Sequence, residues 1–217
     1  KIYIPENKLF AEIIGLLGKG DKIFTYNNNS PIIAKNCIFY QGFQGEMLAP
    51  TAITKIINKI KRDKTIKNKF FDYKNIYIAR GDLDKHRNRR KLLNEDKLIN
   101  VLKKSYPNLK IITPGLITIL DAILIMHNTK NIFSMTGTQL VLNSLFSNNP
   151  KNIIELTPNN YYGLTTGELV AKYKCATYFK SDTKSKKPGW IFYEDQVVNI
   201  TNLKKIVRDL DEKYYNK

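Results

Sequence analysis

A regular alternation of short apolar runs and longer amphipathic segments, over residues 75–158, is the feature that most constrains the fold of this chain. The apolar runs are rich in β-branched and aromatic residues, which is typical of buried strands; they read NIYIA, LKIIT, KNIFSM and KNIIELTP. The segments between them have apolar residues at helical spacing; they read NEDKLINVLKKSY, LITILDAILIMHN and TQLVLNSLFS. Strands that alternate with helices over such short links predict a Rossmann-like α/β fold with a parallel sheet and right-handed crossovers.

The two ends of the chain follow a less regular pattern, and neither contains an internal repeat. The elements expected in the first part are a helix over 6–20, strands over 22–26 and 31–40, and a helix over 49–64 with a basic tail. The elements expected at the end are a strand within 171–182, a polar loop over 182–190, and a helix over 199–217 that Thr201 caps.

The chain is strongly basic. Thirty-six Lys and Arg residues against nineteen Asp and Glu give a formal net charge of +17 over 217 residues. Such a balance favours polyanionic partners, which are nucleic acid, an acidic membrane face or phosphorylated ligands. Lys, Asn and Ile dominate the whole sequence, as in proteins from AT-rich genomes, so the charge alone does not choose among these partners.

The cysteines and the hydropathy pattern exclude some classes. Cys37 and Cys175 are far apart, and no Cys/His cluster has zinc-ligand spacing, so we expect two free thiols in a reducing compartment. No apolar run approaches the roughly 20 residues that a membrane-spanning helix needs. No signal peptide is visible in the given sequence. We therefore expect a cytoplasmic protein.

The carboxyl ends of the predicted strands carry polar and basic residues. In an open parallel sheet, ligands bind beyond these ends. The residues that follow the strands are Arg80 and Arg87–Arg90, then Thr113 and Gly115, then Ser134, Thr136, Gly137 and Thr138, and finally Glu155 and Pro158. The pattern predicts a ligand site along this edge of the sheet.

The most basic stretch, RGDLDKHRNRRKLLNED, begins at Arg80 directly after a predicted strand. It has three interpretations: a solvated loop, a nuclear-import tract or a phosphate site. Acidic residues interrupt it, and Asn94 begins a helix as its predicted N-cap, so it lies inside a folded unit. Guanidinium groups bind phosphate through paired hydrogen bonds, which favours a diphosphate ligand. Cations crowd Asp82 and Asp84, so we expect no metal there.

Two further features lie at the same edge. The turn SMTGTQ leads from a strand into a helix, where Gly137 allows close approach and the free N–H groups suit a phosphate; the alternative is a turn without a ligand, capped by Thr138. Glu155 is the one acid in the apolar run NIIEL. It is either a solvent-facing residue on an edge strand or a carboxylate that accepts hydrogen bonds from sugar hydroxyls.

The ordered set of these motifs resembles glycosyltransferase family 61. The resemblance rests on a strand that ends in Arg, a basic loop leading to Asn-Glu before a helix, a small-residue turn with Gly, an Asn followed by a Phe, and a strand that ends in Glu and Pro. In this chain these are Arg80, Arg89–Arg90, Asn94–Glu95, Gly137, Asn143, Phe146, and Glu155–Pro158.

The resemblance implies the C-terminal half of a GT-B type glycosyltransferase, together with part of the N-terminal half. Residues 1–70 are then the tail of an acceptor-side α/β region, and residues 71–217 the Rossmann-like donor domain. The implied donor-binding residues are Arg80, Arg89, Arg90, Asn94, Thr136, Gly137, Thr138, Asn143 and Glu155. The implied catalytic base is Glu46 or His86, with no metal and no cofactor.

The function expected from this resemblance is inverting, metal-independent transfer of a sugar from a nucleotide-sugar to a glycan or lipid-linked acceptor. The setting would be the synthesis of a surface polysaccharide, such as capsule or lipopolysaccharide, with the basic stretch 55–69 resting on the inner face of the membrane. The alternatives are a nucleic-acid-binding module or a non-catalytic nucleotide-binding domain. Residues 80–91 contain no aromatic side chain, which counts against nucleic acid as a partner.

Overall fold

The computed structural model divides the chain into two compact units, Lys1–Asn68 and Lys69–Lys217. The residues that it describes are 2–5, 23–26, 58–60, 62, 72–79, 91–113, 116–137, 140, 152–158, 167–168, 171, 176–185 and 195–215. The first unit contains a parallel pair of strands, β1 (Ile2–Pro5) and β2 (Ile23–Tyr26). Strand β2 confirms the strand expected there, whereas β1 was not predicted. The helix over 6–20 and the strand over 31–40 lie outside the described residues.

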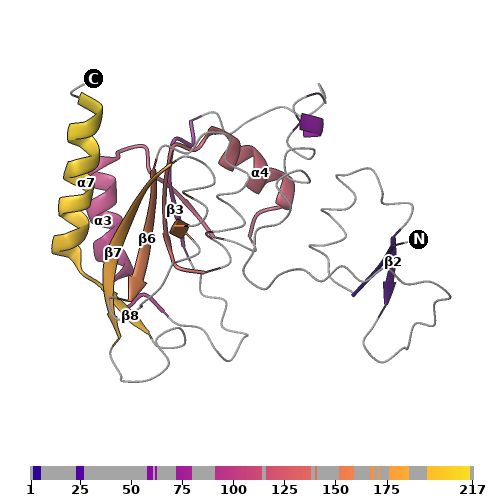
Figure 1. Cartoon of the computed structure of the whole chain (residues 1–217), viewed down its shortest axis with the longest axis horizontal. Helices are drawn as coiled ribbons and strands as arrows, with labels where there is room; N and C mark the ends of the chain where they lie inside the picture. Colours follow the sequence, from indigo (N-terminus) through magenta and orange to yellow (C-terminus); the bar gives the residue numbers. More distant parts are fainter. Residues whose placement is uncertain are drawn as a thin grey trace. The chain divides into compact units, whose positions relative to one another are not determined.

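The second unit is built on a six-stranded sheet in the order β4-β3-β5-β6-β7-β8 (Figure 1). The strands are β3 (Asn75–Ile78), β4 (Lys110–Ile112), β5 (Asn131–Met135), β6 (Asn152–Pro158), β7 (Thr177–Ser185) and β8 (Gln196–Val198). The first five strands of this order pair in parallel, and β8 pairs antiparallel with β7. This mostly parallel α/β layout is compatible with the expected Rossmann-like fold.

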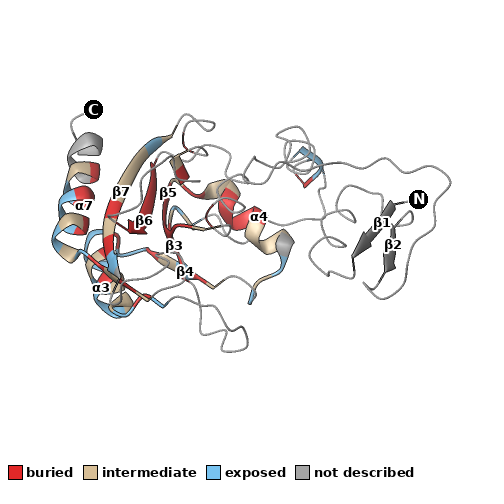
Figure 2. Cartoon of the chain, turned by 60° about the horizontal axis from the view of Figure 1, so that its bottom comes forward, coloured by how far each residue is buried: buried red, intermediate tan, exposed pale blue. Residues whose placement is uncertain are grey.

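Helices cover both faces of the sheet. Helices α3 (Glu95–Ser105) and α7 (Ile200–Tyr215) lie side by side on one face, and α4 (Ile119–Asn128) lies on the other side of the sheet (Figures 1 and 2). The core beneath α3 and α7 includes Tyr77 and Phe133 from the strands and Leu102 and Leu203 from the helices. Burying such side chains supplies the main driving force for folding.

A ladder of asparagines joins three strands at the amino ends of the sheet. Asn75, Asn131 and Asn152 occupy neighbouring positions in the register. Nδ2 of Asn131 donates to Oδ1 of Asn75 at 2.7 Å, and Nδ2 of Asn152 donates to Oδ1 of Asn131 at 2.6 Å. Each amide therefore finds its partner in the next strand, which satisfies these mostly buried polar groups.

Two expectations about the end of the chain need correction, and one strand there was not expected. Strand β7 continues to Ser185, through the start of the predicted polar loop. Strand β8 was not predicted at all. The final helix is capped by Asn199 and not by Thr201, because Oδ1 of Asn199 accepts the N–H of Asn202 at 3.1 Å. Thr201 lies inside α7.

Candidate functional site

The carboxyl ends of β3 and β5 lie next to each other, and the order of the strands reverses between them. From β3 the chain moves outward to β4, returns to β5 on the other side of β3, and continues to β6 and β7. Ile78 pairs with Ser134 near these ends. In open α/β sheets this reversal point is where ligands bind. The basic stretch begins at Arg80, one residue after the last described residue of this region, Ala79.

One face of β5, β6 and β7 becomes polar toward the same edge. The strand register places Ser134, Glu155 and Lys180 side by side. Two residues further along each strand come Thr136, Thr157 and Asp182; Thr157 pairs with Asp182, and the N–H of Thr136 donates to the carbonyl of Leu156 at 3.0 Å. The opposite face of these strands carries the apolar core. In β5 and β6 the polar side chains are therefore concentrated on the face turned away from α3 and α7, whereas β7 also has Ser181 and Thr183 on its opposite face.

Glu155 is fully buried in the middle of this polar face. Strand β6 lies between β5 and β7, so the interpretation of Glu155 as a solvent-facing residue on an edge strand is wrong. The hydroxyl of Tyr178 donates to Oε2 of Glu155 at 3.0 Å, and Oε1 has no hydrogen-bond partner among the described residues. A Cβ at Gly167 would overlap this carboxylate and also press on Leu140, so only glycine fits beside Glu155 without rearrangement.

Thr157 is a second buried residue with unused hydrogen-bonding capacity. It is fully buried, and no described residue is bonded to its Oγ1. Buried polar atoms are nearly always bonded, and Glu155 and Thr157 each have one such atom without a partner among the described residues on the same face of β6. Sequence reasoning missed Thr157. The sequence does contain a signal for it: Thr157 comes two residues after Glu155, which places both side chains on the same face of a strand.

The turn after β5 has the geometry that its sequence indicates. Gly137 adopts φ 148, a backbone conformation that side-chain-bearing residues rarely adopt. The N–H of Leu140 donates to the carbonyl of Gly137 at 3.0 Å, which begins a helical turn. Thr136 is buried beside it. Thr138 and Asn143, the other two residues expected here, lie outside the described residues.

Asn94 lies at the N-cap position of α3, but its side chain does not cap the helix. Instead Nδ2 of Asn94 donates to the carbonyl of Val198 at 3.0 Å, and Oδ1 accepts the N–H of Val198 at 2.9 Å. Its neighbour Glu95 accepts the hydroxyl of Tyr77 at 2.6 Å. The Asn-Glu pair thus joins the start of α3 to both β8 and β3.

Five more residues were expected at the site. Glu46, Arg80, His86, Arg89 and Arg90 lie outside the described residues. Among the residues that are described, no group of three or more His, Cys, Asp or Glu side chains could hold a metal ion. Within the same part of the chain, no helix is both long and apolar enough to cross a membrane.

The fold is that of a mostly parallel α/β protein, and comparison with known families narrows the class. The family model for glycosyltransferase 61 matches residues 2–154. The chain therefore belongs to glycosyltransferase family 61, the family that its sequence resembles. Membership assigns it glycosyltransferase activity, with a nucleotide-sugar donor and a glycan acceptor as the substrates that the family implies. A search of curated proteins finds no match. Glu155, Tyr178 and β8 all follow the matched segment.

Proposed function

We propose that the second unit binds the nucleotide-sugar along the carboxyl edge of its sheet, and that the chain transfers the sugar to a hydroxyl of a glycan or lipid-linked acceptor. The observation that carries this proposal is the adjacency of β3 and β5 at the reversal of strand order. The basic stretch that begins at Arg80 and the turn at Gly137 follow these two strands directly. Both features suit the diphosphate of a nucleotide-sugar.

In this proposal Arg80, Arg89 and Arg90 hold the diphosphate, together with N–H groups of the Thr136–Thr138 turn and polar side chains such as Asn143. Negative charge develops on the leaving nucleoside diphosphate in the transition state, and fixed donors aimed at it lower the barrier. The cations then do the work that a metal ion does in other transferases, so we propose a metal-independent reaction without a cofactor. Activity that survives treatment with EDTA would support this point, and activity restored only by added Mg²⁺ or Mn²⁺ would contradict it.

The nucleoside is proposed to lie against the polar face of β6. Oε1 of Glu155 and Oγ1 of Thr157 are two buried atoms without partners among the described residues, and both can bond to ribose hydroxyls. Tyr178 holds the other carboxylate oxygen. Glu155 has no exposed surface, so donor binding at Oε1 requires a shift of the side chains that cover it.

The finer mechanism is also a proposal. We propose an inverting GT-B type enzyme in which the unit Lys69–Lys217 is the donor domain and the unit Lys1–Asn68 is part of the acceptor half. Inversion needs a base that takes the proton of the acceptor hydroxyl, and Glu46 or His86 would serve. The proposed role is the synthesis of a surface polysaccharide such as capsule or lipopolysaccharide. The proposed location is the cytoplasm, with the basic stretch 55–69 on the inner face of the membrane.

A nucleotide screen tests the proposal against its rival, a nucleic-acid-binding module. The net charge of +17 is the observation that favours the rival. Thermal-shift assays with UDP, GDP, CMP and a short DNA duplex separate the two. We expect stabilisation by a nucleotide that is lost in Arg90→Ala and in Glu155→Ala. Stabilisation by DNA alone, with a steep dependence on salt, would reject the transferase proposal.

A further inference from the structure

The basic stretch that begins at Arg80 is attached to β8 at its C-terminal end. The carbonyl of Lys91 accepts the N–H of Gln196 at 2.8 Å, and the N–H of Leu93 donates to the carbonyl of Gln196 at 2.9 Å. Leu92 thereby forms a parallel bridge with Gln196. Oδ1 of Asp195 accepts the N–H of Lys91 at 2.7 Å. Residues 91–93 therefore pair with the edge of β8 as a short additional strand would.

Asn94 completes this attachment. Its side-chain amide pairs with both the N–H and the carbonyl of Val198, as a peptide group of a neighbouring strand would. The amide thus satisfies both backbone polar groups of an edge residue. Because Asn94 lies at the N-cap position of α3 without capping it, attachment to β8 is the contact that its side chain makes instead.

The described residues on either side of residues 80–90, Ala79 and Lys91, both lie at the carboxyl edge of the sheet. Ala79 follows β3, and its N–H donates to the carbonyl of Ile112 at 2.9 Å, which keeps it paired with β4. At the other end, Gln196 pairs with Ser185, the last residue of β7, because β8 runs antiparallel to β7. In the order of the sheet, β5, β6 and β7 lie between these two points of attachment.

We propose that Asn94 and Asp195 are positioning residues for the donor diphosphate. They do not contact the donor; they fix residue 91 and thereby the end of the arginine-bearing stretch at the edge where the donor binds. This inference rests on the proposed function. It assigns Asn94 a positioning role, whereas the resemblance to the family implied that Asn94 binds the donor. It also assigns a role to Asp195 and β8, which lie beyond the segment that matches the family.

The charge of Asp195 provides a sharp test. Removing a carboxylate beside a basic stretch should strengthen the binding of an anion if charge alone matters. If Asp195 positions the stretch, Asp195→Ala should instead weaken UDP or GDP binding in the 217-residue chain, by about tenfold for the loss of one such hydrogen bond. Asp195→Asn removes the charge and keeps an acceptor for the N–H of Lys91, so it should bind at least as tightly as the wild type.

Isothermal titration with UDP, GDP and uridine separates positioning from loss of structure. Asn94→Leu and Asp195→Ala should raise the Kd of the diphosphate and leave that of uridine unchanged, since uridine carries no phosphate. The matched control is Asn199→Ala, which removes the cap of α7 at the other end of β8. It should lower the Tm without changing either Kd.

The possible outcomes distinguish this inference from the function on which it rests. A wild-type chain that binds neither UDP nor GDP would reject the proposed function itself. Weaker diphosphate binding in Arg90→Ala, but unchanged binding in Asp195→Ala and Asn94→Leu, would reject the positioning role alone. Equal loss of uridine and diphosphate binding in the two positioning variants would likewise reject it, because a general structural defect would then explain the loss.

Discussion

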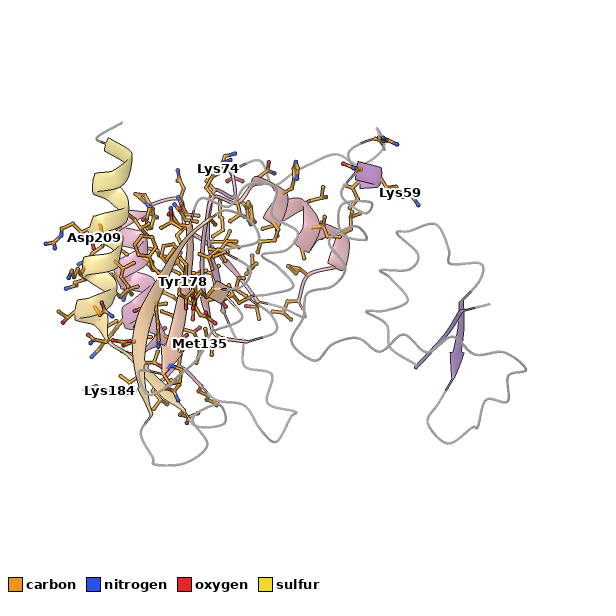
Figure 3. The ribbon with its side chains drawn as sticks, in the orientation of Figure 1. Lys59, Lys74, Met135, Tyr178, Lys184 and Asp209 are labelled. Carbon is orange, nitrogen blue, oxygen red and sulfur yellow. The ribbon has the colours of Figure 1, made fainter. Side chains whose placement is uncertain are left out.

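The hydroxyl of Tyr178 on β7 donates a 3.0 Å hydrogen bond to Oε2 of the fully buried Glu155 on β6. Figure 3 shows Tyr178 within the dense group of side chains around the sheet. Burial of a carboxylate costs free energy unless hydrogen bonds compensate for it. This bond is therefore the contact through which β7 orients the acid that we propose to hold the donor ribose.

Replacing Tyr178 with Phe should reduce both stability and donor binding. The change leaves Oε2 of Glu155 buried without this partner, and we expect the free energy of unfolding to fall by about 1–3 kcal/mol. The Kd of UDP or GDP should rise as the carboxylate loses its orientation. Urea unfolding and calorimetric titration measure the two effects. The control is Ser181→Ala. Oγ of Ser181 is buried without a partner among the described residues, so its removal should leave the Kd unchanged and should not lower the free energy of unfolding. An unchanged Kd in Tyr178→Phe would contradict the orienting role.

Thr157→Val should raise the stability of the protein and weaken its binding of the donor. Valine has nearly the shape of threonine, and the lost hydroxyl is buried without a partner among the described residues. Its removal therefore ends a desolvation cost of about 1 kcal/mol. If the hydroxyl bonds to the donor, the same change should raise the Kd of UDP or GDP by about tenfold. Thermal unfolding and titration on one sample check both directions. A higher Tm with an unchanged Kd would show that Thr157 does not bind the donor.

Gly167→Ala should destabilise the second unit through overlap with the Glu155 carboxylate and with Leu140. Overpacking of this kind typically costs about 1–3 kcal/mol. The double variant Gly167→Ala, Glu155→Ala should recover part of the loss, because the shorter side chain makes room. Denaturant unfolding of the two single variants and the double variant gives the coupling energy. Additive effects would contradict direct contact between residues 167 and 155.

Asn131→Ala should reduce stability and leave nucleotide binding intact. The amide of Asn131 donates to Asn75 and accepts from Asn152, so its loss leaves polar atoms on both neighbours without these partners. We expect a loss of about 1–3 kcal/mol for each group left unsatisfied in a buried position. The ladder lies at the amino ends of the strands, away from the carboxyl edge. A large change in the Kd of UDP or GDP would show that the two edges are coupled.

The ion pair between Asp72 and Lys110, at 2.9 Å, should make stability depend on pH only outside the neutral range. The hydrogen bond from Lys110 lowers the pKa of Asp72 from its ordinary 3.8, and the same bond raises the pKa of Lys110 from 10.5. The contribution of Asp72 is present above pH 3.8 and is lost as the pH falls through its lowered pKa. The contribution of Lys110 is present below pH 10.5 and is lost as the pH rises through its raised pKa.

Comparison with Asp72→Asn tests this pH dependence. The difference in Tm between the wild type and this variant should be small and constant from pH 5 to pH 9, since both groups are exposed and water screens their attraction. The difference should shrink toward strongly acidic and strongly alkaline pH. A difference that changes near neutral pH would have another origin.

The alternating middle of the second unit was predictable from sequence because each element has a strong periodic pattern. Strands β3 to β6 and helices α3 and α4 lie where the apolar runs and helical spacings predict them. Helix α4 begins at Ile119, after the Thr118 cap, because the hydroxyl of Thr118 accepts the N–H of Asp121. The cap, rather than the first apolar residue of the run, sets that boundary.

The features that the sequence could not predict depend on tertiary contacts. Strand β8 is three residues long and carries no readable periodicity; it exists because β7 and residues 91–93 pair with it. Glu155 left two interpretations open, and the choice between them required the position of β6 inside the sheet. Likewise, Asn94 has the sequence signature of a helix cap, but the nearby backbone of Val198 offers it two hydrogen bonds instead.

The contacts between Asn94 and Val198 join residues that are 104 positions apart in the chain. Contacts of such long sequence separation form late, because a long loop must close before they contribute. During synthesis, the partner of Asn94 emerges only after most of the sheet has left the ribosome. We therefore expect nucleotide binding to be the last property that the second unit acquires as it folds, and a chain released before residue 198 to contain most of the sheet but lack the attachment of its basic stretch.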